Sequence, residues 1–125
     1  MPFINVKVLP SVSQDDRSRL AEGVVALMVT VLGKRREATS VLVEELAGAL
    51  WTIGNIPVTS AVHIDVKVTK GTNSVEQKRA FLAGVFELVR DIFGSGIPPY
   101  SYTVIHEVDG DAWGYDGKLQ SDRMR

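Results

Sequence analysis

INVKV, residues 4–8, returns almost unchanged as IDVKV at residues 64–68, an offset of sixty positions. Other landmarks recur at offsets of sixty-one or sixty-two: Ser13 with Ser74, Gly33 with Gly94, Glu45 with Glu107, and Trp51 with Trp113. Self-similarity at one period identifies a duplicated structural unit. The slow drift of the offset is what small loop insertions produce, so we interpret the chain as two tandem copies of one unit.

Each copy carries the signals of a strand, a helix and a second strand. The first strands contain the repeated Val- and Ile-rich segments. Ser13 and Ser74 are good helix N-caps, and after each one the hydrophobic period lengthens from two residues to about 3.6. Gly33 and Gly94 then act as helix stop signals. The second strands are expected at residues 40–46 and 102–108.

These elements predict an α+β fold. A right-handed crossover makes the two strands of each unit parallel, and two units side by side give a four-stranded sheet with two helices on one face. We expect one domain of two β-α-β repeats, residues 1–57 and 58–125, each ending in a short C-terminal hairpin. The strands are nearly continuous in Val, Ile and Leu, which indicates a sheet that is apolar on both faces and packs against other sheets in an oligomer.

Composition narrows the function classes. The 125 residues are 45% hydrophobic and 23% charged, which suits one globular domain. Fourteen basic residues nearly cancel fifteen acidic ones, and no block of Lys and Arg indicates a nucleic-acid partner. The sequence contains no cysteine, no apolar run long enough to span a bilayer and no targeting leader at its start. We therefore expect a cytoplasmic protein with no nucleic-acid partner and no membrane partner.

Pro2 is the first candidate for chemistry. A small second residue commonly allows removal of Met1, which would leave Pro2 with a free secondary amine that is both a base and a nucleophile. The simpler interpretation is that proline suits the first residue of a strand because it has no N–H to donate. An α-amino group titrates at about 7.7–8.0, and burial or nearby cations lower that pKa toward the range useful for proton transfer.

A Met-Pro start, a β-α-β unit of about sixty residues and the aromatic-glycine segments WTIGN and WGYDG together resemble the tautomerase superfamily, typified by 4-oxalocrotonate tautomerase. The tandem arrangement is similar to the fused members of that superfamily. The resemblance implies a homotrimer without a cofactor, in which Pro2 is the general base or acid in keto–enol tautomerisation of a small 2-oxo acid or enol. The second unit has no free amine, because Val62 and His63 stand inside the chain where its proline would be.

The resemblance also implies a set of substrate-binding residues. Two arginines of the best-known tautomerase are missing, since the aligned positions hold Val12 and Ser40. Lys70 is then the candidate ligand for a substrate carboxylate or carbonyl. Trp51 is expected in the pocket wall, and Tyr102 is a candidate hydrogen-bond donor to an enolate.

Trp113 and Tyr115, in the hairpin of the second unit, complete the expected substrate-binding set. Asp116 beside them is a candidate for activating water, as a carboxylate does in dehalogenating relatives, which keeps a hydratase or hydrolytic dehalogenase open as an alternative. A non-catalytic binding scaffold is a third hypothesis, favoured by the missing arginines. The hairpin aromatics also have a simpler interpretation as interface packing.

The remaining charged residues have simpler expected roles. Lys7 and Lys67 are expected to face solvent or a sheet edge. Arg35 and Arg36 follow a helix end, where cations complement the helix dipole. His63 and His106 have no ligand spacing, and we expect no metal.

Overall fold

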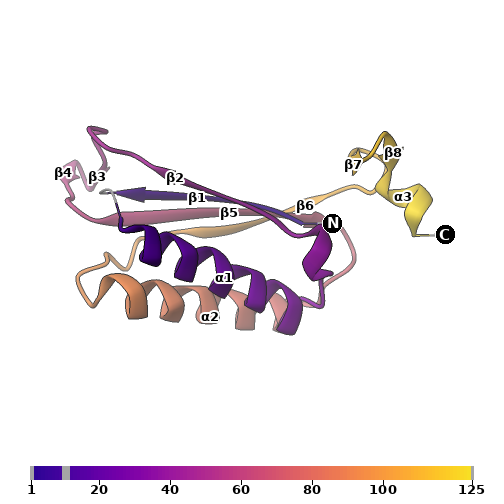
Figure 1. Cartoon of the computed structure of the whole chain (residues 1–125), viewed down its shortest axis with the longest axis horizontal. Helices are drawn as coiled ribbons and strands as arrows, with labels where there is room; N and C mark the ends of the chain where they lie inside the picture. Colours follow the sequence, from indigo (N-terminus) through magenta and orange to yellow (C-terminus); the bar gives the residue numbers. More distant parts are fainter. Residues whose placement is uncertain (1, 10–11, 125) are drawn as a thin grey trace.

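The computed structural model describes residues 2–9 and 12–124, and it shows a four-stranded β-sheet with two long helices on one face (Figure 1). Met1, whose removal would free the Pro2 amine, lies outside the described residues. The first unit contains β1 (Phe3–Leu9), α1 (Gln14–Thr30), the short 3-10 helix η1 (Arg36–Ala38) and β2 (Ser40–Glu45). The hairpin strands β3 (Thr52–Ile53) and β4 (Ile56–Pro57) follow it.

The second unit repeats this order. It contains β5 (Ala61–Thr69), α2 (Val75–Phe93) and β6 (Thr103–Val108), followed by the hairpin strands β7 (Gly114–Tyr115) and β8 (Lys118–Leu119) and the short helix α3 (Gln120–Arg123). The expected N-caps are confirmed, because the side chains of Ser13 and Ser74 accept hydrogen bonds from the backbone N–H groups of Asp16 and Gln77.

The four long strands lie in the order β2-β1-β5-β6. The outer pairs β1–β2 and β5–β6 are parallel, as the crossover argument predicts, and the central pair β1–β5 is antiparallel. The two units are therefore related by an approximate twofold axis between β1 and β5. Both β1 and β5 alternate buried and less buried positions, so one face of the sheet meets the helices.

The core fills the space between the sheet and the helices. Its largest fully buried side chains come from the two central strands and the two long helices. They include Ile4, Val6 and Val8 of β1, Ile64, Val66 and Val68 of β5, Leu20 and Met28 of α1, and Phe81 and Val85 of α2. Burying such side chains contributes about 1.5–3 kcal/mol each relative to exposure. This layer fixes the sheet on which the functional site is built.

The face of the sheet that carries no helix is mixed rather than apolar, which corrects the expectation of two apolar faces. Phe3, Leu42 and Val104 lie on it, but its centre is polar. Hydrogen bonds run from Asn5 Nδ2 to Glu44 Oε1 at 2.7 Å and from His106 Nε2 to Asp65 Oδ1 at 2.8 Å. Strict alternation sends the Val and Ile residues to the helix face, which leaves polar residues on this one.

The two hairpins lie at opposite ends of the sheet (Figure 1). Each closes with two residues at positive φ: Gly54 and Asn55 in the first hairpin, and Asp116 and Gly117 in the second. That conformation is the type I′ turn, whose twist matches that of paired strands. The β7–β8 hairpin lies at the end where the chain begins, and β3–β4 lies at the other. In the described ranges, no helix is long and apolar enough to cross a membrane.

Candidate active site

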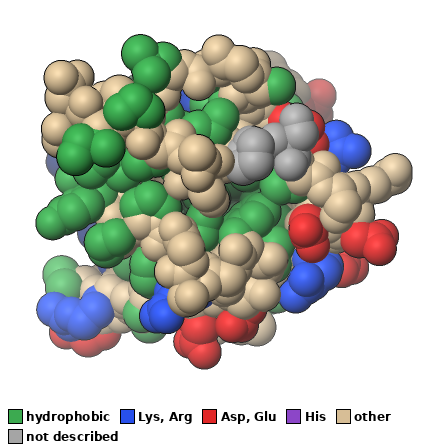
Figure 2. Space-filling model, turned by 90° about the vertical axis from the view of Figure 1, so that its left-hand side faces the viewer, with side chains coloured by type: hydrophobic (Ala, Val, Ile, Leu, Met, Phe, Trp, Pro, Cys, Tyr) green, Lys and Arg blue, Asp and Glu red, His purple; other side chains and the backbone are tan. Residues whose placement is uncertain are grey.

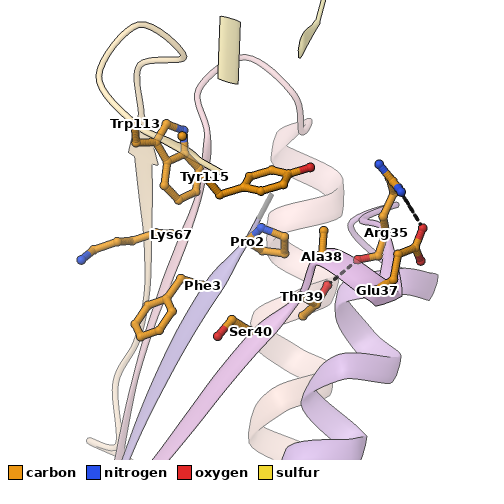
Figure 3. Close-up of a pocket in the computed structure, with 11 residues that line it drawn as sticks. Pro2, Phe3, Arg35, Glu37, Ala38, Thr39, Ser40, Lys67, Trp113 and Tyr115 are labelled. Carbon is orange, nitrogen blue, oxygen red and sulfur yellow. Dashed lines mark hydrogen bonds and ion pairs between the residues drawn. The ribbon is translucent and has the colours of Figure 1, made fainter. Parts of the chain in front are cut away.

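A cavity of about 810 Å³ opens at the end of the sheet where β1 begins. It is lined by Pro2, Phe3, Arg35, Glu37, Ala38, Thr39, Ser40, Lys67, Trp113, Gly114 and Tyr115. Figure 3 shows Pro2 in the middle of this group, with Lys67 on one side and Arg35 and Glu37 on the other. We call this cavity the Pro2 pocket.

Backbone pairing places Pro2 in the pocket. Pro2 directly precedes β1, and its carbonyl oxygen accepts a hydrogen bond from the N–H of Ser40 at 3.1 Å. This bond joins the beginnings of two parallel strands, so Thr39 and Ser40 line the pocket beside Pro2. Pro2 is buried, and burial disfavours the charged form of any amine at this position.

The β7–β8 hairpin supplies one wall of the pocket. The indole Nε1–H of Trp113 donates a hydrogen bond to Thr69 Oγ1 at 3.2 Å. The Tyr115 ring is stacked against the guanidinium of Arg123, 3.8 Å from the ring centre, and Arg123 also donates a hydrogen bond to the Tyr115 carbonyl oxygen. Gly114 has to be glycine, because a Cβ there would collide with the carbonyl oxygen of Lys118 across the hairpin.

Two cations and one carboxylate line the same pocket. Lys67 is paired with Phe3 in the antiparallel register of β5 and β1, and its Nζ lies 6.0 Å from the centre of the Phe3 ring. Arg35 Nη2 lies 2.8 Å from Glu37 Oε1. The hydrogen bond and charge of Glu37 raise the pKa of Arg35, while a backbone hydrogen bond and Arg35 lower the pKa of Glu37. Both groups are therefore fully charged at neutral pH.

This arrangement suits a small, planar anion. The cations attract a carboxylate, and the rings of Phe3, Trp113 and Tyr115 provide an apolar wall against Pro2. Nothing in the lining has the chemistry of a metal site. Elsewhere in the part of the chain that the structure describes, no three His, Cys, Asp or Glu side chains gather as metal ligands would.

The family model described as "Tautomerase enzyme" matches the chain twice, at residues 2–60 and again at residues 63–123. The chain belongs to the tautomerase family. A probable tautomerase of Dickeya dadantii (strain 3937) is 33% identical over 62 residues, which cover 50% of this chain and 91% of the relative. Half of this chain thus spans nearly the whole relative, as a tandem duplication requires.

Solved structures share the tautomerase fold across almost the whole chain. A fused 4-OT, described as a wild-type asymmetric trimer, has a TM-score of 0.84 at 19% identity and covers 98% of this chain and 99% of its own. A member of the cis-3-chloroacrylic acid dehalogenase family has a TM-score of 0.79 at 23% identity, covering 94% of this chain and 82% of its own. These likenesses establish a fused tautomerase fold.

The substrate-binding residues expected from the tautomerase resemblance fall in three places. Trp113 and Tyr115 line the Pro2 pocket. Trp51 and Tyr102 line another cavity together with His63. Lys70 is exposed and lines neither of these two cavities.

Sequence reasoning missed the charged residues of the Pro2 pocket. Lys67 was expected at solvent or a sheet edge, and it is exposed. The prediction did not foresee that it also lines the pocket, because β5 pairs antiparallel with β1. Arg35 and Glu37 reach the pocket because η1 directs the chain past Pro2 into β2. Asp116, the expected water-activating carboxylate, lies in the hairpin turn at a φ of 54° and not in the lining. The sequence signal that could have indicated Arg35 and Glu37 as pocket residues is the charged run that directly precedes β2.

Proposed function

We propose that this fused tautomerase is an isomerase that interconverts the enol and keto forms of a small 2-oxo acid, with the Pro2 amine moving the proton. The observation that carries the proposal is the burial of Pro2 in a pocket that also contains Arg35, Lys67 and aromatic walls. Burial and cations in the same pocket both lower the pKa of an amine, which favours its neutral form near pH 7. Pro2 is buried, and Arg35 and Lys67 line the same cavity.

The mechanism needs only proton transfer. With Met1 removed, the neutral Pro2 amine takes the hydroxyl proton of an enol, and the protonated amine then delivers a proton to carbon to give the ketone. Arg35 and Lys67 hold the substrate carboxylate and stabilise negative charge that develops on oxygen. The Tyr115 hydroxyl, which Figure 3 shows directed toward Arg35, is a further donor at that oxygen. No cofactor is required.

We also propose that the protein is a cytoplasmic homotrimer whose only small-molecule partner at this pocket is the enol or 2-oxo acid. The fused 4-OT of the same fold is a trimer, and the mixed sheet face of this chain leaves Leu42 48% exposed and Val104 37% exposed. Three chains of 13.7 kDa make a particle of about 41 kDa. Light scattering at neutral pH measures that mass directly, and a monomer or dimer would contradict the proposal.

The decisive experiment follows the enol-to-keto conversion of phenylenolpyruvate and 2-hydroxymuconate by ultraviolet absorbance. Pro2→Ala is expected to lower kcat/KM by about 10²–10⁴, the usual contribution of a general base. The matched control is Pro57→Ala, which changes an exposed proline of the β3–β4 hairpin and is expected to leave kcat/KM unchanged. Equal activity of Pro2→Ala and the parent, or a protein mass that still includes Met1, would refute catalysis by proline.

Hydrolytic dehalogenation is the second candidate, and one observation favours it. Glu37 places an ionised carboxylate in the Pro2 pocket, where it would activate water while a protonated Pro2 acts as the acid. Chloride release from cis-3-chloroacrylate tests this activity. If dehalogenation is the function, Glu37→Gln abolishes chloride release, whereas a tautomerase tolerates the same change. If none of these compounds is turned over, the non-catalytic binding scaffold is the hypothesis that remains.

A further inference from the structure

A second cavity, of about 480 Å³, lies at the opposite end of the sheet, beside the β3–β4 hairpin. It is lined by Trp51, Thr52, Ile53, Gly54, His63, Tyr100 and Tyr102. We call it the Trp51 pocket. Figure 2 views the molecule from this end and shows that hydrophobic side chains gather over part of the surface.

Strand register shows that the Trp51 pocket is the twofold counterpart of the Pro2 pocket. Ile4 pairs with Val41 in the first unit, and Ile64 pairs with Thr103 in the second. One position earlier on each strand, Phe3 and Ser40 correspond to His63 and Tyr102. Phe3 and Ser40 line the Pro2 pocket, and His63 and Tyr102 line the Trp51 pocket. Each pocket is completed by the tryptophan of one hairpin.

The two pockets differ in charge. The lining of the Trp51 pocket contains no Lys, Arg, Asp or Glu, whereas the Pro2 pocket contains Arg35, Lys67 and Glu37. Lys7 is the counterpart of Lys67 and pairs with His63 in the register, but its Nζ donates a hydrogen bond to Asn5 Oδ1 on the central sheet. Val62, the counterpart of Pro2, is a buried chain residue without a free amine.

The polar side chains that line the Trp51 pocket are those of Thr52, His63, Tyr100 and Tyr102. Tyr100 and Tyr102, whose phenol hydroxyls can donate and accept hydrogen bonds, line the cavity and are 61% and 62% exposed. His63 is held from behind, since its Nε2 lies 3.2 Å from Asp65 Oδ1 on the sheet. Asp65 is engaged a second time by His106. The imidazole is therefore fixed at the edge of the cavity with its other ring nitrogen unused by that contact.

We propose that the Trp51 pocket is a second ligand site that takes neutral aromatic carbonyl compounds. Trp51, Tyr100 and Tyr102 provide ring surfaces for stacking, and a phenol hydroxyl donates to the carbonyl oxygen. A carboxylate would lose hydration there without gaining a Lys or Arg partner, so this lining disfavours the 2-oxo acids that suit the Pro2 pocket. The proposal is independent of catalysis at Pro2.

The test uses the two tryptophans, because each pocket holds one of them. Their indole N–H signals in a ¹⁵N NMR spectrum of the whole protein are assigned with Trp51→Phe and Trp113→Phe. The probes are 4-phenyl-2-butanone and 3-phenylpropanoate, which differ in having a methyl ketone or a carboxylate on the same carbon chain. The ketone is expected to shift the Trp51 signal saturably, and 3-phenylpropanoate is expected to bind there at least about tenfold more weakly.

A matched variant locates the binding. Tyr102→Ser places at this position the residue type that stands at position 40 in the Pro2 pocket, and it is expected to weaken ketone binding at least about tenfold. Lack of a saturable shift of the Trp51 signal by the ketone would overturn the proposal, as would equal binding of the carboxylate. If a neighbouring subunit covers the cavity, the ketone will produce no saturable shift of the Trp51 signal, and the proposal is overturned in the same way. Loss of turnover in Pro2→Ala has no bearing on this measurement.

Discussion

At the scale of single residues, the Pro2 pocket is defined by the sign and position of its charges. Arg35 is paired with Glu37, but both side chains are mostly exposed, so the pair is open to exchange with a substrate carboxylate. Lys67 has no carboxylate partner within ion-pair distance among the described residues. An entering anion would therefore meet Lys67, which has no such partner in the described part of the chain, and Arg35, which can exchange Glu37 for the anion.

Arg35→Gln is expected to raise KM for phenylenolpyruvate, lowering kcat/KM about tenfold, because one charge-assisted contact is lost. Arg35 also opposes protonation of the Pro2 amine, so its removal moves the ascending limb of the pH–rate profile to higher pH. Steady-state kinetics across pH measure both effects. The control is Arg36→Gln, which removes the neighbouring exposed cation that does not line the pocket. Equal losses of kcat/KM in the two variants would show that Arg35 acts only through its long-range charge and makes no contact with the substrate.

At the scale of elements, the helices begin where their caps allow. Ser74 and Gln77 form a complete capping box: Ser74 Oγ accepts from the Gln77 N–H at 3.1 Å, and Gln77 Oε1 accepts from the Ser74 N–H at 2.9 Å. Ser13 has only the first of these bonds, to the N–H of Asp16. The start of α2 is thus better satisfied than the start of α1, although the two units share one plan.

Ser74→Ala is expected to lower the free energy of unfolding by about 1 kcal/mol, since the backbone N–H of Gln77 at the start of α2 loses its acceptor, Ser74 Oγ. Urea denaturation at fixed protein concentration measures the change, because the stability of an oligomer depends on concentration. Ser18→Ala is the control: Ser18 is exposed in the interior of α1, where alanine is the better helix former, so the expected change is small and stabilising. A Ser74 variant as stable as the parent would contradict the capping argument.

At the scale of the whole molecule, the approximate twofold axis passes near the register pair of Asn5 and Asp65. The two sides of the axis differ chemically, because Asn5 bonds Glu44 while Asp65 is flanked by His63 and His106. The hydrogen bond from His106, followed by that from His63, lowers the pKa of Asp65 from its ordinary value of 3.8. The two pockets differ as well, because Arg35, Glu37 and Lys67 line the Pro2 pocket while the lining of the Trp51 pocket contains no Lys, Arg, Asp or Glu.

This lowered pKa sets the sign of a pH effect. A carboxylate whose pKa falls on folding stabilises the folded state above its unfolded pKa, and the contribution disappears as pH falls through the folded value. Asp65→Asn is therefore expected to make the loss of stability below about pH 4 shallower. Urea denaturation at several acidic pH values measures the slope. The control is Asp91→Asn on the exposed surface of α2, and a slope changed equally by both variants would contradict the assignment to Asp65.

Much of this molecule follows from signals that are local in the sequence. Alternating Val and Ile residues specify β1 and β5, a serine followed three residues later by a capping partner specifies each helix start, and the sixty-residue repeat specifies the tandem fold. Pro2 is also a local signal, because its place directly after Met1 is read from the sequence, whereas the pocket around it comes from the tertiary structure. Helix periods, caps and strand alternation act over a few residues, so a single sequence carries them.

The composition of each pocket was decided only by the tertiary structure. The antiparallel pairing of β1 with β5 brings Lys67 to the start of β1, and the hairpin of the second unit closes the Pro2 pocket of the first. The type I′ turn keeps Asp116 out of the lining. These placements depend on strand order and register between segments some sixty residues apart. The repeat predicts two units of one plan, and Val62 in the place of Pro2 already distinguishes them in sequence. The packing of one unit against the other then decides that Arg35, Glu37 and Lys67 line one pocket, while the lining of the other contains no Lys, Arg, Asp or Glu.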